Sequence, residues 1–280
     1  MKILHIVPGL NEGANGIAVA ARLVAARQRR DGDEVALVDV RDVAAQTPAA
    51  LAPFPVVWVH SMWLPATMRA CHRVLCAKRI LVRMVHANLD PLRLHNGAGW
   101  KKALVAPFER ALMRAADCVV VTCPAERAWS RAWGVPEGKI EFFDLKACFD
   151  LPEKPVEAKV SGRPLKVLFM GRADDPLKGL RYLQRAIEGL KVELRVETQA
   201  FGDAKEAAFA WCDVLCLPTL SENFGLVVAE ALQRGRRVVV TDGATAWADD
   251  PRLVYVSGFR GGDDVSRVRL LREVLQGMGE

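Results

Sequence analysis

The sequence lacks any apolar run of the ~20 residues that a membrane-spanning helix needs. Its first residues, MKILHIVPGL, contain a short strand instead of the apolar core of a signal peptide. No CxxC pair is present, and the seven cysteines, an odd number, lie mostly in apolar surroundings, which indicates reduced core thiols in a reducing compartment. We therefore expect a cytoplasmic protein.

Internal repeats and low-complexity tracts are also lacking, and 51% hydrophobic with 26% charged residues is typical of a globular protein with room for two domains. The net charge of +6 arises in residues 1–150, which carry 20 Lys and Arg against 14 Asp and Glu. This basic half suits an anionic acceptor or peripheral association with the inner membrane; plain solubilising charge is the alternative, and both stay open. No nucleic-acid module is recognised, so nucleic acid is not expected as a partner.

Buried strands alternate with helical patterns, which predicts an α/β protein with parallel sheets. A segment rich in Pro and charge, 151–164, is typical of a linker. We expect two Rossmann-like, doubly wound domains, 1–150 and 151–280, with a C-terminal helix at 263–278 that could pack back on the first. The expected strands are 2–7, 34–40, 56–60, 79–85, 117–122 and 139–143, then 165–170, 192–196, 213–217 and 237–241.

The stretch 211–243 predicts a strand, a polar loop, a helix over 224–232 and a second strand. The loop follows the carboxyl end of a parallel strand, and unpaired N–H groups at the helix start attract an anion. With Gly225 as an early helical residue, Glu230 lies about one and a half turns down the helix, roughly 7 to 8 Å along its axis, while Glu222 lies just before the helix. Such a pair suits two hydroxyl-bearing groups flanking a phosphate, although two glutamates at this spacing are more commonly a solvated helix face.

A second loop, GRADDPLKGL, carries Arg172 and Lys178 six residues apart at the mouth of the next helix. Two cations beside helix N-termini are what a diphosphate leaving group needs, because negative charge grows on it as its bond breaks. A Gly-Arg turn followed by a lysine is also a common structural turn. Together with the Glu222 loop, the pattern favours phosphate binding.

The first half offers further candidates. The loop Pro8–Gly16, which includes Gly13, precedes a helix over 17–30 and could approach a phosphate closely, although a structural connection is the alternative. His60 and His86 end two parallel strands and should point into the same crevice; a lone histidine is more often structural.

The helix expected over 101–116 is amphipathic and basic. It could rest on anionic lipid. We expect instead an ordinary surface helix with a core face formed by Leu104, Phe108 and Leu112.

The phrase CDVLCLPTLSENFGLVVAEAL, with Glu222 and Glu230 around Asn223-Phe224-Gly225, resembles the E-x7-E signature of the retaining GT-B glycosyltransferases of family 4. GRADDPLKGL is similar to that family's Gly-Arg…Lys-Gly motif, and MVHANLDPLRLHNGAGWKK to its segment with a histidine before a small residue. The resemblance implies a GT-B type fold, in which two Rossmann-like domains face each other across a cleft.

The resemblance also implies roles for these residues. Arg172 and Lys178 would stabilise the diphosphate, Glu222 would hold hydroxyls of the transferred sugar and Glu230 those of the ribose, while His86 would lie near the reacting carbon. The implied catalytic residues are His86, Glu222, Arg172 and Lys178; the implied donor-binding residues are Gly16, Arg172, Lys178, Asn223, Phe224, Gly225, Leu226 and Glu230; His60 and Asn15 are weaker candidates on the acceptor side.

The implied activity is retaining, metal-independent transfer of a sugar from a UDP-, GDP-, ADP- or dTDP-linked donor to a hydroxyl of a glycan or glycolipid acceptor, in bacterial lipopolysaccharide or surface polysaccharide synthesis. No metal and no other cofactor are expected, because cations replace the metal and no carboxylate cluster is evident.

Two alternatives stay open. Residues 191–211 hold one strand and one helix where the family usually has about another pair, so the chain could be a catalytically impaired relative that binds sugar nucleotides or acts as a partner subunit. A sugar-nucleotide epimerase of the same architecture is the other alternative, although the first loop does not supply GxGxxG.

Overall fold

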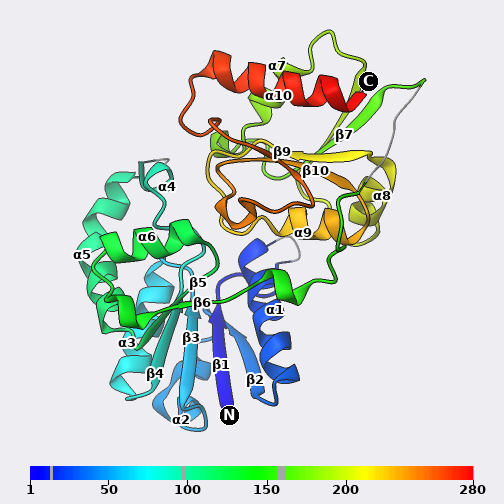
Figure 1. Cartoon of the computed structure of the whole chain (residues 1–280). Coiled ribbons are helices and arrows are strands. Elements are labelled where there is room, and N and C mark those ends of the chain that lie inside the picture. The colour runs from blue at the N-terminus through cyan, green and yellow to red at the C-terminus, as the bar shows by residue number, and fades with distance from the viewer. Residues whose placement is uncertain (13–14, 96–98, 157–161, 280) are drawn as a thin grey trace. The chain divides into compact units, whose positions relative to one another are not determined.

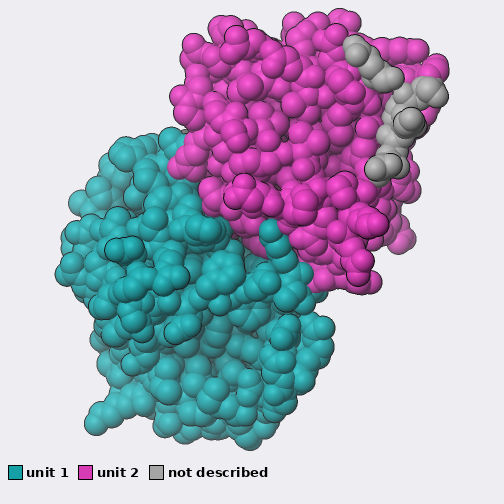
Figure 2. Space-filling model, in the orientation of Figure 1, with its two compact units in different colours: residues 1–148 teal, residues 149–280 magenta. Residues whose placement is uncertain are grey.

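A computed structural model of the chain describes residues 1–12, 15–95, 99–156 and 162–279. The chain divides into two compact units, residues 1–148 and residues 149–280 (Figure 2). Gly13 of the predicted glycine loop and residues 157–161 of the predicted linker lie outside the described residues.

The first unit contains a six-stranded parallel sheet in the order β2-β1-β3-β4-β5-β6. Because the chain starts inside the sheet and winds outward in both directions, right-handed crossovers place helices on both faces. Figure 1 shows α1 on one face and α3 and α5 on the other. The strands are β1 (Lys2–Val7), β2 (Glu34–Asp39), β3 (Val56–His60), β4 (Ile80–Met84), β5 (Cys118–Val121) and β6 (Ile140–Phe142). The helices are α1 (Gly16–Arg30), α2 (Pro48–Leu51), α3 (Pro65–Cys76), α4 (Pro91–His95), α5 (Gly99–Ala115) and α6 (Pro124–Ala132).

The second unit contains a five-stranded parallel sheet in the order β11-β10-β9-β7-β8. Helix α10 packs against α7 and contributes Leu271 and Leu275 to the core. Both units are thus Rossmann-like, as the alternating pattern predicts. The strands are β7 (Leu165–Met170), β8 (Val192–Glu197), β9 (Val214–Leu217), β10 (Arg237–Thr241) and β11 (Val254–Val256). The helices are α7 (Leu180–Ala186), α8 (Asp203–Trp211), α9 (Leu226–Gln233) and α10 (Asp264–Gly279).

The core face predicted for α5 is wrong. Leu104 is 66% exposed and Phe108 is 67% exposed, and only Leu112 packs partly against the core. The buried residues of this helix are Met113 and Glu109. The carboxylate of Glu109 faces inward because it pairs at 3.2 Å with the guanidinium of Arg83, which is buried in β4.

None of the seven cysteines, all of which lie in described parts of the chain, forms a disulfide. Burial raises the pKa of Cys216 to about 12 and that of Cys212 to about 11. Within the described ranges, no helix combines the length and the apolar character that a membrane span requires.

Candidate functional site

Buried hydrogen bonds fix the loop between β9 and α9. The hydroxyl of Thr219 lies 3.0 Å from the carbonyl oxygens of both Leu177 and Ser221, and the amide of Glu222 donates to the carbonyl of Gly243 at 2.9 Å. A Cβ atom on Gly243 would come within 2.2 Å of the Thr219 carbonyl oxygen, so this close approach requires glycine. These contacts hold the backbone that carries Glu222.

The turn after β7 docks against the same loop. Its short 3-10 helix, η4 (Pro176–Lys178), ends at Gly179, whose φ of +71° lies in the left-handed region. A Cβ atom there would lie 1.8 Å from the carbonyl oxygen of Pro218. Because only glycine allows this approach, Gly179 sets the position of Lys178 relative to Glu222.

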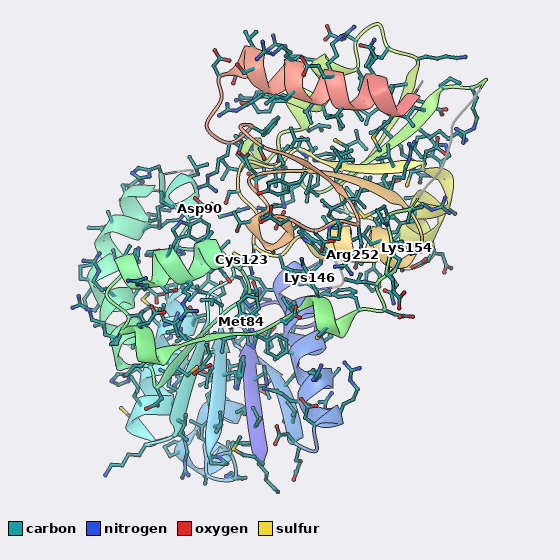
Figure 3. All side chains as sticks on the ribbon, viewed as in Figure 1. Met84, Asp90, Cys123, Lys146, Lys154 and Arg252 are labelled. Carbon is teal, nitrogen blue, oxygen red and sulfur yellow. The ribbon has the colours of Figure 1, made fainter. Side chains whose placement is uncertain are left out.

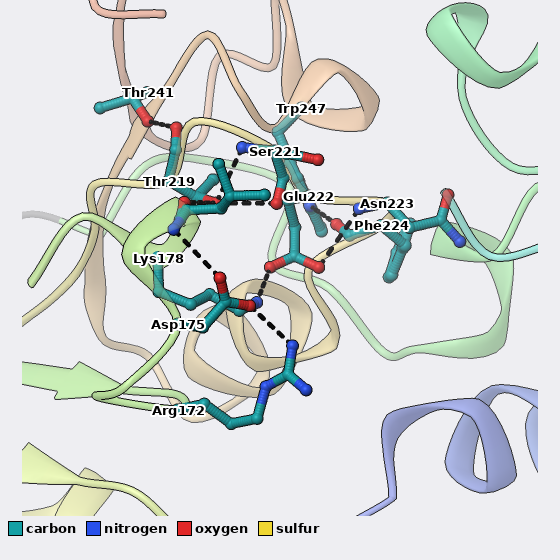
Figure 4. Close-up of polar contacts among 11 residues, drawn as sticks. Arg172, Asp175, Lys178, Thr219, Ser221, Glu222, Asn223, Phe224, Thr241 and Trp247 are labelled. Carbon is teal, nitrogen blue, oxygen red and sulfur yellow. Dashed lines mark hydrogen bonds and ion pairs between the residues drawn. The ribbon is translucent and has the colours of Figure 1, made fainter. Parts of the chain in front are cut away.

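Lys178 and Glu222 form an ion pair between their ammonium and carboxylate groups, and both side chains are largely buried. Arg172 pairs with Asp175 at 2.6 Å, yet its side chain is 66% exposed. Asp175 also accepts a hydrogen bond from the amide of Leu177 at 3.0 Å, which fixes this carboxylate at the start of η4. Figure 4 shows the guanidinium of Arg172 pointing toward the Lys178–Glu222 pair. The structure therefore gathers both predicted cations and the predicted carboxylate on one loop cluster.

Helix α9 begins two residues later than the pattern predicts, at Leu226. Gly225 is not an early helical residue: it precedes the helix with a φ of +72°, which glycine adopts without steric cost. The first amides of the helix therefore follow this glycine near the carboxyl end of β9, where backbone N–H groups can meet an anion.

The second predicted glutamate has a lysine of its own. Glu230, on α9, pairs with Lys205 of α8 at 2.6 Å. Asn223 donates its backbone amide to the carboxylate of Glu222 at 3.2 Å. The two glutamates thus belong to separate ion pairs.

Phe224 belongs to the core. Its ring stacks on Phe149 with centroids 6.0 Å apart and lies 5.1 Å from the ring of Trp247. The indole N–H of Trp247 donates to the Phe224 carbonyl oxygen. Only 3% of Phe224 is exposed, so its side chain anchors the loop instead of facing a ligand.

In the first unit, Asn15 caps helix α1. Its side-chain oxygen accepts from the amide of Ile17 at 3.0 Å, and its side-chain nitrogen donates to the carbonyl of Pro8 at 3.0 Å. Gly16 is the first residue of the helix and is exposed. The side chain of Asn15 is therefore engaged in capping, while the backbone at Gly16 remains accessible to a ligand.

Three histidines form a hydrogen-bonded chain across the first sheet. His60 ends β3 and His86 follows β4; in Figure 3, Met84 marks the end of β4. Nδ1 of His60 lies 3.0 Å from Nε2 of His86, and Nε2 of His60 lies 2.8 Å from Nδ1 of His5. At the far end, Nε2 of His5 lies 2.8 Å from the side-chain oxygen of Gln28. The structure thus brings His60 and His86 together and adds His5.

The proton positions along this chain follow from the orientation of the Gln28 amide. Because Gln28 presents its amide oxygen, Nε2 of His5 donates and Nδ1 of His5 accepts. The same alternation requires a proton on Nε2 of His60 and of His86, and leaves Nδ1 of His86 as an acceptor. Burial lowers the pKa of His5 and of His86 to about 4, and also lowers the pKa of His60. All three rings are therefore neutral near pH 7.

Several groups that support His86 are not among the sequence-predicted residues. His86 and Ala87 both have left-handed backbone, with φ of +54° and +58°. The buried carboxylate of Glu126 accepts from the amides of Ala87 at 2.6 Å and of Thr122 at 2.8 Å, and burial raises its pKa. The sequence contains one sign of the histidine chain that supports His86: His5 is a polar residue inside the apolar strand KILHIV.

The described residues contain no group of three or more His, Cys, Asp or Glu side chains arranged to hold a metal ion. Metal-independent chemistry nevertheless stays a prediction, because substrate phosphates can themselves supply metal ligands.

Two Rossmann-like units, the second with cations and carboxylates gathered at its β9–α9 loop, define a protein of the GT-B type. Solved structures share this fold. The lipopolysaccharide outer core galactosyltransferase WaaB superposes with a TM-score of 0.67 at 13% identity, covering 100% of this chain and 92% of that one. HepE from Anabaena, in complex with UDP and glucose, superposes with a TM-score of 0.64 at 14% identity, covering 100% of this chain and 94% of that one.

Residues 16–145 match the family model of the glycosyl transferase 4-like domain, and residues 156–252 match that of the glycosyl transferases group 1. Together the two models span most of the chain: the first unit is similar to the glycosyl transferase 4-like domain and the second unit to the glycosyl transferases of group 1. A Klebsiella pneumoniae protein, described as an uncharacterized 41.2 kDa protein in the cps region, is 24% identical over 220 residues and covers 69% of this chain. The chain spans 61% of the length of that curated relative.

Proposed function

We propose that this protein is a retaining, metal-independent glycosyltransferase of the cytoplasm. It moves a sugar from a UDP-, GDP-, ADP- or dTDP-linked donor to a hydroxyl of a glycan or glycolipid, in the synthesis of bacterial lipopolysaccharide or surface polysaccharide. Three similarities support this proposal. HepE, which shares the fold, was solved in complex with UDP and glucose, and WaaB, which also shares it, is a lipopolysaccharide outer core galactosyltransferase. The Klebsiella relative is described as a protein in the cps region.

The observation that carries the proposal is the Lys178–Glu222 ion pair with Arg172 beside it. Lys178 is neutralised by its ion pair with Glu222. A bound diphosphate brings additional negative charge, so it attracts Lys178 and the exposed guanidinium of Arg172. Glu222 is then released to accept hydrogen bonds from hydroxyls of the transferred sugar. As the glycosidic bond breaks, the two fixed cations stabilise the growing charge on the leaving phosphate.

The other residues complete the donor site. The amides at the start of α9, after Gly225, face a phosphate oxygen, and Glu230 accepts from the ribose hydroxyls once Lys205 shifts. The unprotonated Nδ1 of His86 accepts a hydrogen bond from a sugar hydroxyl near the reacting carbon. The acceptor attacks the same face that the diphosphate leaves, and the departing phosphate oxygen takes the acceptor's proton, which retains the configuration.

Donor binding tests this function first. UDP, GDP, ADP and dTDP sugars are screened for thermal stabilisation, because a ligand that binds only the folded chain raises the melting temperature. The preferred donor is then offered to Arg172→Ala, Lys178→Ala and Glu222→Ala, with Arg269→Ala on α10 as the matched exposed-arginine control. Each site variant should lose about 2 to 4 kcal/mol of transition-state stabilisation in transfer or donor hydrolysis, and the control none. Unchanged rates in all three variants would refute the site.

A catalytically impaired, donor-binding relative is the second candidate. The short stretch between β7 and β9 favours it, because β8 and α8 are the only regular elements of residues 191–211. Stabilisation by a sugar nucleotide, with neither transfer nor hydrolysis for any donor, would support this candidate over the enzyme.

A further inference from the structure

Helix α5 presents an apolar stripe to solvent. Trp100, Leu104 and Phe108 recur every four residues, so they lie on the same face of the helix. Each of these side chains is about two thirds exposed, at 67%, 66% and 67%. Single exposed apolar residues are ordinary on a protein surface, but a contiguous stripe of three large ones marks a contact surface.

The stripe continues into a groove between α5 and α3. The groove has a volume of about 710 Å³, and Phe108 forms part of its wall. Its other apolar lining includes Met68, Val105 and Leu112, while Arg69 and Arg73 of α3 supply charge. The apolar surface is therefore wider than the helix face alone.

Positive charge borders this surface on both sides. Lys101 follows the first stripe residue, and Arg110 and Arg114 lie on the opposite flank of α5. The guanidinium of Arg110 stacks over the ring of Trp133 at 5.2 Å, which holds it at the helix edge. Basic residues therefore flank the stripe on both sides of the helix.

Carboxylates are scarce in the same two helices. The only acidic residue between positions 99 and 115 is Glu109, which is buried against Arg83, and the sequence from 65 to 76 contains none. Within these two helices, the charged groups that flank the apolar stripe are all cations, and such a surface complements one that is apolar inside and anionic outside. An anionic phospholipid bilayer has this character, because acyl chains lie beneath phosphate headgroups.

We propose that the stripe of Trp100, Leu104 and Phe108, with Lys101, Arg69 and Arg110 around it, is a docking face for an anionic phospholipid bilayer. The helix lies in the plane of the headgroups, with the stripe inserted at the acyl boundary and the basic groups on the phosphates. This docking is a property beyond sugar transfer, and it can be measured without an assay of transfer. Under the proposed function, docking would also bring the enzyme to a glycolipid acceptor.

Co-sedimentation of the full chain with vesicles tests the docking. Phosphatidylcholine vesicles are compared with mixed phosphatidylcholine and phosphatidylglycerol vesicles at low and high salt. We expect binding to the anionic vesicles that weakens with salt. The double variant Leu104→Ser and Phe108→Ser should lower the partition coefficient by about tenfold or more. Lys101→Gln with Arg69→Gln should lower it by about fivefold per charge on anionic vesicles only.

Two controls separate docking from a general loss of apolar surface. Phe201→Ser and Val265→Ser remove side chains that are 63% and 71% exposed in the second unit, and they should leave the partition coefficient unchanged. Melting curves with the preferred sugar nucleotide show whether each variant is folded and still binds donor. A failure of docking can therefore be distinguished from a failure of the proposed function.

Three outcomes would overturn the proposal: no sedimentation of the unaltered chain, equal binding of all variants, or a dimer in light scattering that the stripe substitutions dissociate. The last result would assign the stripe to a second copy of the chain.

Discussion

Nδ1 of His60 lies 3.0 Å from Nε2 of His86, so the ring that we place beside the sugar is held by a second ring. His60 is in turn held by His5, and His5 by Gln28. Since each neutral imidazole has one donor and one acceptor, the amide orientation of Gln28 determines the tautomer of His86 through two intervening rings.

Nitrogen-15 NMR of the histidine rings can show directly which ring nitrogen of each histidine carries the proton. We expect a proton on Nε2 and none on Nδ1 for His5, His60 and His86 at neutral pH, assigned by substituting each histidine with glutamine in turn. Gln28→Glu places a carboxylate beside His5 and should raise its pKa. A proton on Nδ1 of His86 would mean that the chain runs in the reverse direction, with the Gln28 amide nitrogen toward His5.

The same burial makes stability depend on pH. The pKa of His5 falls from 6.5 in the unfolded chain to about 4 in the folded one, so the unfolded state binds more protons between these values. The contribution of His5 to stability is therefore fully present above pH 6.5 and is lost as the pH falls toward 4. Through His5 alone, the free energy of unfolding should fall by about 2 kcal/mol as the pH is lowered from about 7 to about 5. Urea titrations measure the loss, which His5→Gln should reduce; a flat profile would contradict neutral burial.

Gly179 offers a sharp test of how the Lys178 turn is built. Gly179→Ala places a methyl group 1.8 Å from the Pro218 carbonyl oxygen at a φ of +71°, and it should destabilise the chain by about 3 kcal/mol or more, with loss of donor binding. Gly189 is the matched control, since its φ is +74° and no atom lies within 4 Å of an added Cβ. Gly189→Ala should cost about 1 kcal/mol. Equal melting temperatures for the two variants would show that the close approach to Pro218 does not matter.

Much of this architecture follows from local patterns. The strands at 2–7, 56–60, 165–170 and 237–241 agree with the predicted bounds, because apolar β-branched runs ended by turn residues leave little freedom. The Glu222 loop could likewise be placed, since strand ends and helix starts fix where an anion can bind. Helix α3 and strand β11 have no counterpart among the expected elements.

The remaining features depend on pairing between distant residues. Hydropathy places Glu109 on the surface of α5 and Leu104 in the core, but the buried Arg83 reverses that order. The chain of His5, His60 and His86 needs three neighbouring strand positions, and strand order cannot be read from one sequence. Gly225 looks helical by spacing, whereas its φ of +72° shows a turn.

The Arg83–Glu109 pair, which turns the apolar stripe of α5 outward, can be tested by its own removal. Glu109→Leu leaves the guanidinium buried without a counter-charge and should cost about 3 to 5 kcal/mol of unfolding free energy in urea titrations. Among the described residues, Nε and Nη1 of Arg83 have no hydrogen-bond partner, so the arginine is poorly compensated even when paired. Adding Arg83→Met to Glu109→Leu should therefore recover most of the lost free energy of unfolding. Glu137→Leu, which breaks the exposed pairs with Arg127 and Arg131, is the control and should cost less than about 1 kcal/mol. If the double variant is no more stable than Glu109→Leu alone, the cost lies in the hydrogen bond from the Trp63 amide to Glu109 and not in the unpaired charge.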